Sequence, residues 1–136
     1  METAKPDPAP QLFSVLLVED NPSDGQLFSR FLKSPKLGEA SVQLVSSLQQ
    51  AIVEGVNTSH SVILLDLQLP DTSGMETLFA LQRRTDTPII VLTGYGDEQL
   101  GIQAVQNGAQ DFLVKSDTNR DLLWKSIRYA VERHKP

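Results

Sequence analysis

The sequence predicts an α/β fold, a doubly wound parallel sheet of five strands with helices on both faces. Five short apolar runs alternate with five segments in which apolar residues recur at helical spacing. The clearest run, Val-Ile-Leu-Leu at 62–65, is uninterrupted, which is typical of a strand buried on both faces. Strands that alternate with helices in this way form βαβ units with right-handed crossovers. We therefore expect a single parallel sheet.

The expected elements follow one another without an internal repeat or a second domain. The strands comprise residues 13–18, 42–45, 62–66, 88–93 and 111–115. One-sided apolar residues mark the helices: Leu27, Phe28, Phe31 and Leu32, then Leu48, Ala51 and Ile52, then Met75, Leu78, Phe79 and Leu81, then Ile102, Val105 and Ala109, and finally Leu123, Ile127, Ala130 and Val131. Ser34–Gly38 closes the first helix, the third begins near Ser73, and Asn107-Gly108 ends the fourth. The flavodoxin-like strand order 2-1-3-4-5 would close such a sheet.

Length and composition indicate one globular domain and argue against several function classes. The 136 residues are 40% hydrophobic and 21% charged, with a net charge of −5 that disfavours nucleic-acid binding by this domain. The lack of cysteine excludes disulfides and thiolate metal sites. No apolar run reaches bilayer-spanning length, and the first ten residues lack the apolar segment of a secretory signal. We expect a cytoplasmic protein without membrane contact, with a disordered lead-in at 1–11 and one domain at 12–136.

Polar side chains follow four of the expected strands. Glu19 and Asp20 come after the first strand, Asp66 ends the third, Thr93 ends the fourth and Lys115 ends the fifth. In the predicted order the first and third strands are neighbours, so their carboxylates would converge at one edge of the sheet. Each residue taken singly is more often a turn, cap or surface residue. Their coincidence at one edge favours a functional site.

The residue types at this edge suit phosphoryl transfer. Three converging carboxylates repel one another unless some are protonated or a cation binds, and oxygen ligands shared with water suit Mg²⁺. Lys115 would hold a phosphoryl oxygen as a point charge, and the Thr93 hydroxyl would donate a hydrogen bond to another. Asp66 would be the nucleophile, because carboxylates form aspartyl-phosphate intermediates.

Four motifs resemble those of the receiver domains of two-component response regulators. They are Val15-Leu-Leu-Val-Glu-Asp20-Asn-Pro, Ile63-Leu-Leu-Asp66-Leu-Gln-Leu-Pro70 with Gly74, Val91-Leu-Thr93-Gly94, and Gly108-Ala-Gln-Asp-Phe-Leu-Val-Lys115. The resemblance covers about residues 12–134. It implies that Asp66 accepts a phosphoryl group from a histidine kinase or phosphotransfer protein. Such a domain is a signalling switch in a phosphorelay and not an enzyme beyond its own phosphorylation and dephosphorylation.

The resemblance also implies a role for each site residue. The Mg²⁺ ligands would be Glu19, Asp20, Asp66 and the backbone carbonyl of Gln68. Thr93 and Lys115 would contact the phosphoryl group, and Phe112 stands where the family has its switch aromatic. One departure is Ser116, which follows Lys115 where the family usually has proline, so a cis Lys-Pro bond is unavailable and the loop geometry stays open.

Some features lie outside this site. Trp124 and Tyr129 fall partly off the buried side of the last helix, which suits partial packing or a partner surface equally. We hypothesise that the face formed by the fourth helix, the fifth strand and the last helix is a homodimer or partner site. His60 and His134 have no ligand spacing and are expected at the surface.

Two other functions remain open at this stage. A phosphorylation-independent interaction domain would bind no Mg²⁺. A Mg²⁺-dependent phosphatase of the haloacid dehalogenase type also uses an aspartate after a strand, but it needs a second acid two residues later, where Gln68 stands.

Overall fold

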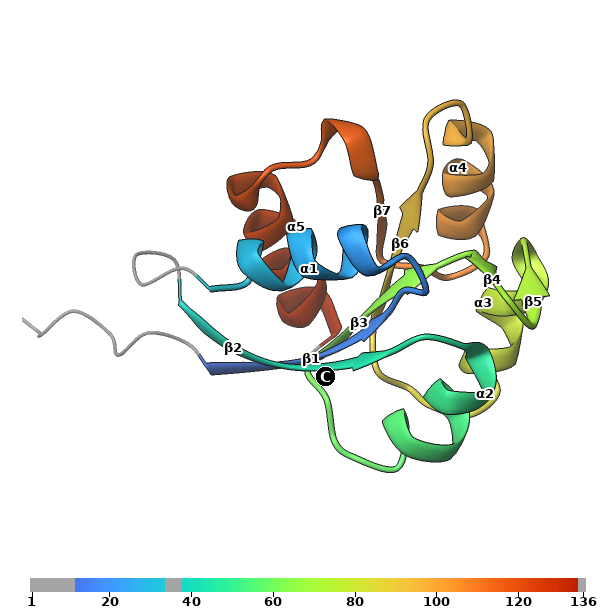
Figure 1. Ribbon diagram of the computed structural model, residues 1–136, viewed down its shortest axis with the longest axis horizontal. Coiled ribbons are helices and arrows are strands. Elements are labelled where there is room, and N and C mark those ends of the chain that lie inside the picture. The colour runs from blue at the N-terminus through green and yellow to red at the C-terminus, as the bar shows by residue number, and fades with distance from the viewer. Residues whose placement is uncertain (1–11, 34–37, 135–136) are drawn as a thin grey trace, which may run out of the picture.

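The computed structural model describes residues 12–33 and 38–134 (Figure 1). The predicted lead-in at 1–11 and most of the turn that was expected to close the first helix, residues 34–37, lie outside the described residues, as do the last two residues. In the described part of the chain, no helix is both long and apolar enough to cross a bilayer.

The central sheet has the predicted order. Its strands are β1 (Leu12–Val18), β2 (Glu39–Val45), β3 (Val62–Asp66), β6 (Ile89–Thr93) and β7 (Asp111–Val114). They lie in the order β2-β1-β3-β6-β7, and every neighbouring pair is parallel. The predicted flavodoxin-like order is therefore confirmed, with β6 and β7 as its fourth and fifth strands. All five carboxyl ends meet at one edge of the sheet, called the carboxyl edge below.

Helices cover both faces of this sheet (Figure 1). They are α1 (Pro22–Phe31), α2 (Leu48–Gln50), which continues into a π-helical turn η1 (Ala51–Gly55), α3 (Met75–Gln82), α4 (Glu98–Gln106) and α5 (Arg120–His134). One apolar cluster joins the sheet to α1 and α5, and a second joins the opposite face to α2, α3 and α4. The doubly wound architecture predicted from the sequence is thus observed.

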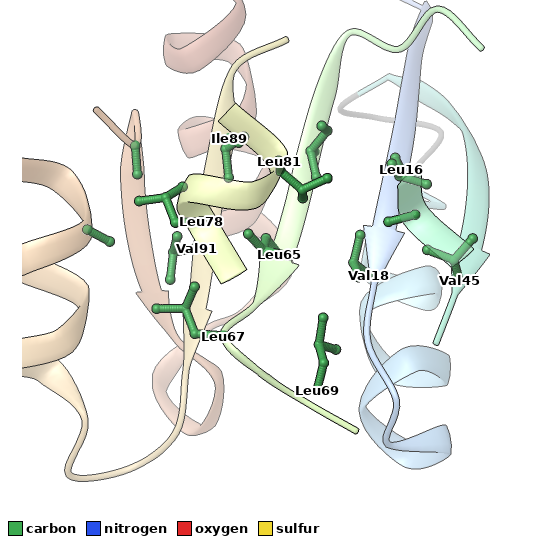
Figure 2. Close-up of a cluster of buried hydrophobic side chains, with 14 residues drawn as sticks. Leu16, Val18, Val45, Leu65, Leu67, Leu69, Leu78, Leu81, Ile89 and Val91 are labelled. Carbon is green, nitrogen blue, oxygen red and sulfur yellow. The ribbon is translucent and has the colours of Figure 1, made fainter. Parts of the chain in front are cut away.

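Consecutive residues of the strands supply both clusters, because their side chains point alternately to the two faces. Leu16 of β1 belongs to the cluster under α2 to α4, whereas Leu17 belongs to the cluster under α1 and α5. Figure 2 shows Leu81 of α3 lying over β3 and Leu78 lying beside Val91 of β6. Each fully buried leucine stabilises the fold by about 1.5–3 kcal/mol through the removal of apolar surface from water. These two layers hold the strand ends of the carboxyl edge in place.

The segment after Asp66 contains an element that the sequence did not indicate. Strands β4 (Gln68–Leu69) and β5 (Thr72–Ser73) form a small antiparallel hairpin, with Pro70 and Asp71 at its tip. Helix α3 begins at Met75, two residues later than predicted, after Gly74 adopts a positive φ of 66°. Glycine takes this backbone conformation without the steric cost that other residues meet.

The predicted apolar side of the fourth helix is wrong. Ile102 and Val105 of α4 are 41% and 40% exposed, whereas Gly101 and Ala104 are buried. A Cβ atom at Gly101 would lie 2.3 Å from Cδ2 of Phe112, so the missing side chain lets the Phe112 ring pack directly on the helix backbone. The close approach of α4 to β7 thus selects the buried side of this helix against its apolar periodicity.

The predicted exposure of two aromatic residues and of the two histidines is only partly confirmed. Trp124 is completely buried, and its Nε1 donates a hydrogen bond to the carbonyl of Phe31 at 2.8 Å, so its predicted partial exposure is wrong. Tyr129 is 54% exposed and His134 is exposed, as expected. His60, expected at the surface, is half-buried between β1 and β2.

Candidate functional site

The carboxyl edge brings the polar strand-end residues together. Asp66 is the last residue of β3. In the sheet, Val18 of β1 pairs with Leu65 of β3, and Asp66 pairs with Leu92 of β6. Glu19 therefore emerges from β1 beside Asp66. Asp66 is 6% exposed and Glu19 is 2% exposed, so both carboxylates are buried. Burial of charged groups on this scale requires compensation by partners or by a cation.

Lys115 provides part of this compensation. It begins a single 3₁₀ turn, η2 (Lys115–Asp117), directly after β7, so the loop containing Ser116 continues as a short helix. The Lys115 Nζ donates to Asp66 Oδ2 at 3.0 Å and forms an ion pair with Glu19 Oε2 at 2.6 Å. It also donates to Asp24 Oδ2 at 3.1 Å.

Asp24 was not predicted as a member of this site. It lies in the first turn of α1, where acidic residues are common because they interact favourably with the helix dipole. The one sequence signal for its presence in the site is its short spacing from Glu19 and Asp20, since α1 starts immediately at the carboxyl edge. Together, Glu19, Asp20, Asp24, Asp66 and Lys115 form what is called the carboxyl-edge cluster below.

The two oxygens of Asp66 have different partners. Oδ1 accepts a hydrogen bond from the backbone N–H of Gln68 at 2.9 Å, and Oδ2 faces Lys115. The Gln68 side chain is exposed, so this residue reaches the site through its backbone. The hairpin of β4 and β5 follows at once, and Asp71 at its tip accepts hydrogen bonds from the backbone N–H groups of Leu48 and Gln49 at 3.0 and 2.9 Å. The loop that fixes the Asp66 carboxylate is therefore anchored to the start of α2.

Thr93 ends β6, the strand next to β3, and Phe112 lies in the edge strand β7. Thr93 is 2% exposed, and its Oγ1 donates to the carbonyl of Leu113 at 3.4 Å, a long and weak hydrogen bond. Phe112 is partly buried and contacts Gly101 of α4. These two residues connect the end of β6 and the edge strand β7 to α4.

The donor set at the carboxyl edge fits a hard divalent cation. One carboxylate oxygen from each of Glu19, Asp20 and Asp66 lies within 4.8 Å of the others. Among the described residues, no hydrogen-bond donor is aligned with the buried Glu19 Oε2, which meets Lys115 only as an ion pair. Oxygen-only ligands of this kind suit Mg²⁺, which keeps several waters and accepts a few carboxylates.

Burial and neighbouring charges shift the pKa values of Glu19 and Lys115. Burial raises the pKa of Glu19 to about 7, and the nearby Asp66 adds to this effect, although Lys115 lowers it. Burial alone would lower the pKa of Lys115, but its close contacts with the carboxylates of Glu19 and Asp66 outweigh burial and raise that pKa. Lys115 is therefore a permanent cation that the carboxylates of Glu19, Asp24 and Asp66 share.

Known proteins resemble this chain in sequence and in fold. The family described as the response regulator receiver domain matches residues 15–127. The chain is 34% identical over 118 residues to the regulatory protein LuxO of Vibrio cholerae, and the match covers 86% of this chain and 25% of LuxO. It is 32% identical over 124 residues to the acid tolerance regulatory protein ActR of Rhizobium meliloti, and the match covers 90% of this chain and 62% of ActR.

A solved structure agrees with these matches. A response regulator receiver domain protein of Clostridium thermocellum superposes with a TM-score of 0.75 at 27% identity, over 89% of this chain and 95% of that one. The chain spans less than two thirds of the length of both LuxO and ActR. Receiver domains generally bind Mg²⁺ in an acidic pocket and interact with histidine kinases or phosphotransfer proteins. The chain belongs to the response regulator receiver domain family, the phosphoacceptor domains of two-component signalling.

Proposed function

We propose that this chain is a phosphorylation-dependent switch and that Asp66 is its phosphoacceptor. The observation that carries the proposal is the position of the Asp66 carboxylate. It is buried at the carboxyl edge, 3.0 Å from a lysine ammonium and within 4.8 Å of the Glu19 and Asp20 carboxylates. A nucleophile, a fixed cation and a set of metal ligands thus meet at one point.

The reaction is a phosphoryl transfer from a phosphohistidine of a kinase or phosphotransfer protein. An oxygen of the Asp66 carboxylate attacks phosphorus, the P–O bond forms, and the P–N bond to the donor imidazole breaks with its electron pair left on nitrogen. Lys115 binds an oxygen of the transferred group and offsets its negative charge. Because the barrier is lowered mainly by positioning and electrostatics, fixed charges around Asp66 suffice.

The charge of the site also calls for a divalent cation. Glu19, Asp20, Asp66 and the backbone carbonyl of Gln68 would hold Mg²⁺, which neutralises phosphoryl oxygens when bound. The backbone N–H of Gln68 already donates to Asp66 Oδ1, so this residue lies against the nucleophile. The family affiliation supports the same ion.

The switch is proposed to act through Thr93 and Phe112. The hydrogen bond from Thr93 Oγ1 to the Leu113 carbonyl is long, at 3.4 Å, so a phosphoryl oxygen competes with it readily. Movement of Thr93 toward Asp66 would change the packing of Phe112 against α4. Phosphorylation would then favour one of two pre-existing arrangements of the face formed by α4, β7 and α5.

The partners follow from this mechanism. The phosphoryl donor is a histidine kinase or phosphotransfer protein, and the face of α4, β7 and α5 is the proposed surface for a second copy of the chain or another partner. The net charge of −5 and the acidic site do not favour nucleic-acid binding by this domain. The chemistry suits a cytoplasmic phosphorelay without membrane contact.

The test is the intact mass of the protein after incubation with Mg²⁺ and acetyl phosphate, a small phosphodonor. The parent should gain one labile phosphoryl group in a Mg²⁺-dependent manner, and Asp66→Asn should gain none. Absence of both the adduct and Mg²⁺ binding would contradict the proposal and favour a phosphorylation-independent interaction domain. Continuous turnover of phosphate esters would instead favour a phosphatase.

A further inference from the structure

Asp24 brings a carboxylate from α1 to the ammonium of Lys115. Its Oδ2 lies 3.1 Å from Lys115 Nζ. Its backbone N–H donates to Asn21 Oδ1 at 3.0 Å, and Pro22 occupies the first turn of the helix. This N-cap fixes the turn that carries Asp24, so the carboxylate is held toward the site and is not a freely moving surface group.

Three carboxylate oxygens already surround the Lys115 ammonium. An ammonium group has three N–H donors and no acceptor. Among the described residues, Lys115 Nζ contacts three carboxylate oxygens, from Glu19 at 2.6 Å, Asp66 at 3.0 Å and Asp24 at 3.1 Å. A phosphoryl oxygen on Asp66 therefore competes with these carboxylates for the ammonium, and its approach favours the release of one of them.

The exposure of the three partners decides which one is released. The side chain of Glu19 is completely buried and that of Asp66 is 8% exposed, whereas that of Asp24 is 33% exposed. A carboxylate that already touches water regains its hydration at little cost, but a buried one without its cation does not. Asp66 itself carries the phosphoryl group. Asp24 is thus the partner most easily displaced.

We propose that Asp24 is a displaceable positioning residue that holds Lys115 before phosphorylation and yields it to a phosphoryl oxygen afterwards. This inference rests on the proposed function, because it assumes that Asp66 is the phosphoacceptor. It makes Asp24 a competitor of the phosphoryl group for one N–H donor. It also links phosphorylation to the first turn of α1, since the Asp24 carboxylate is freed when Lys115 turns to the phosphoryl group.

The experiment compares Asp24→Ala and Asp24→Asn with Asp97→Asn, which neutralises an exposed carboxylate on the loop after Thr93. The time course of the phosphoryl adduct is followed by intact mass at saturating Mg²⁺ and fixed acetyl phosphate. Adduct formation should be faster in Asp24→Ala than in Asp97→Asn by roughly twofold to tenfold, the range expected for loss of a partly exposed ion pair. Asp24→Asn should fall between them, because its amide oxygen still accepts a hydrogen bond.

A second readout separates displacement from a purely structural role. The ¹³C signal of the Asp24 carboxyl in the parent should shift when Asp66 is phosphorylated, while that of Asp86, an exposed carboxylate before β6 at the opposite edge of the sheet, should not. Equal adduct rates in the Asp24 and Asp97 variants, slower rates in the Asp24 variants, or an unchanged Asp24 signal would each overturn the inference and leave the proposed function intact. Failure of the parent to form an adduct would overturn both.

Discussion

At the amino ends of β1 and β3, the His60 ring lies between the Ser14 hydroxyl and the Gln43 amide oxygen, each 3.0 Å away, and the Ser61 hydroxyl accepts from the Ser14 backbone. At the carboxyl ends of the same strands, three carboxylates contact Lys115, and a fourth, that of Asp20, lies beside two of them. The first group, called the amino-edge cluster, joins its members through polar hydrogen bonds. The carboxyl-edge cluster concentrates negative charge that its single lysine does not neutralise.

We infer that the amino edge of the sheet serves stability and that the carboxyl edge serves chemistry. Satisfied polar groups stabilise a fold modestly, by about 0.5–1.5 kcal/mol for each hydrogen bond. Like charges held together cost stability, and proteins retain them where a ligand or a reaction uses them. Substitutions at the amino edge should therefore change stability without changing phosphorylation, and substitutions at the carboxyl edge should do the reverse.

The largest effect is expected for Asp66→Asn. Phosphorylation by acetyl phosphate should be abolished, because the amide is not a nucleophile. The free energy of unfolding in Mg²⁺-free buffer should not fall, since one repelling charge is removed and the amide oxygen still accepts from the Gln68 backbone. Urea unfolding beside the intact-mass assay checks both, and a loss of several kcal/mol would show that Asp66 is a structural residue.

Lys115→Ala should separate phosphorylation from its consequence. The acyl phosphate should still form, but the neighbouring face should not change conformation, because no cation ties the phosphoryl group to β7. Amide spectra of the phosphorylated protein measure this directly. If the variant shows the same phosphorylation-dependent shifts as the parent, Lys115 does not transmit the signal.

Gly101→Ala tests how the site is joined to α4. An alanine in a helix is normally more stable than glycine by about 0.8–1 kcal/mol, but here its Cβ would meet the Phe112 ring at 2.3 Å. We expect a net loss of about 1–3 kcal/mol from overpacking. Gly25→Ala in α1 is the matched control, because its Cβ would lie 3.4 Å from Leu44. In a Phe112→Ala background, the Gly101→Ala substitution should no longer lower the free energy of unfolding. A loss that persists in this background would assign the effect to another contact.

His60→Ala should break the amino-edge cluster alone. Loss of the contacts to Ser14 and Gln43 should lower the free energy of unfolding by about 1–2 kcal/mol. The rate of phosphorylation should stay within error of the parent. His134→Ala removes an exposed histidine and serves as the control, with an expected change within about 0.5 kcal/mol. A slower adduct in His60→Ala would contradict the separation of the two edges.

The smallest effect concerns pH. Burial lowers the pKa of His60 from its ordinary 6.5, although a hydrogen bond to the backbone of Gly55 opposes this. The unfolded chain then binds more protons than the folded chain, so the contribution of His60 to stability is present above pH 6.5 and is lost as the pH falls. In His60→Gln, the free energy of unfolding should decline less between about pH 7.5 and 5.5 than in the parent. An identical decline would show that His60 titrates normally.

The sheet order and most of the carboxyl edge were predictable because parallel strands collect their carboxyl ends on one side. Strand boundaries and local residue types then sufficed to bring Glu19, Asp66 and Lys115 together. Asp24 was missed because its position depends on how α1 is rotated against the strand ends, which apolar periodicity does not specify. Sequence patterns of one element thus do not reveal contacts between a helix and a neighbouring strand end.

Tertiary packing also explains the wrong predictions elsewhere. The packing of Phe112 against Gly101 determines which side of α4 faces the sheet. The hydrogen bond from Trp124 to the end of α1 accompanies the burial of the indole ring. A Cβ atom at Gly55 would lie 2.6 Å from a methyl group of Leu16, so the glycine lets the end of the π-helical turn approach β1 closely. Each of these features is a contact between distant segments, and no local pattern encodes it.

The most direct test of the central claim is reductive trapping of the phosphorylated residue. The parent is incubated with Mg²⁺ and acetyl phosphate and treated with borohydride, which converts an aspartyl phosphate to homoserine, and the peptides are sequenced by mass spectrometry. We expect homoserine at position 66 only, dependent on Mg²⁺. Homoserine at another aspartate, or unmodified aspartate at position 66 in protein that carries the adduct, would contradict it.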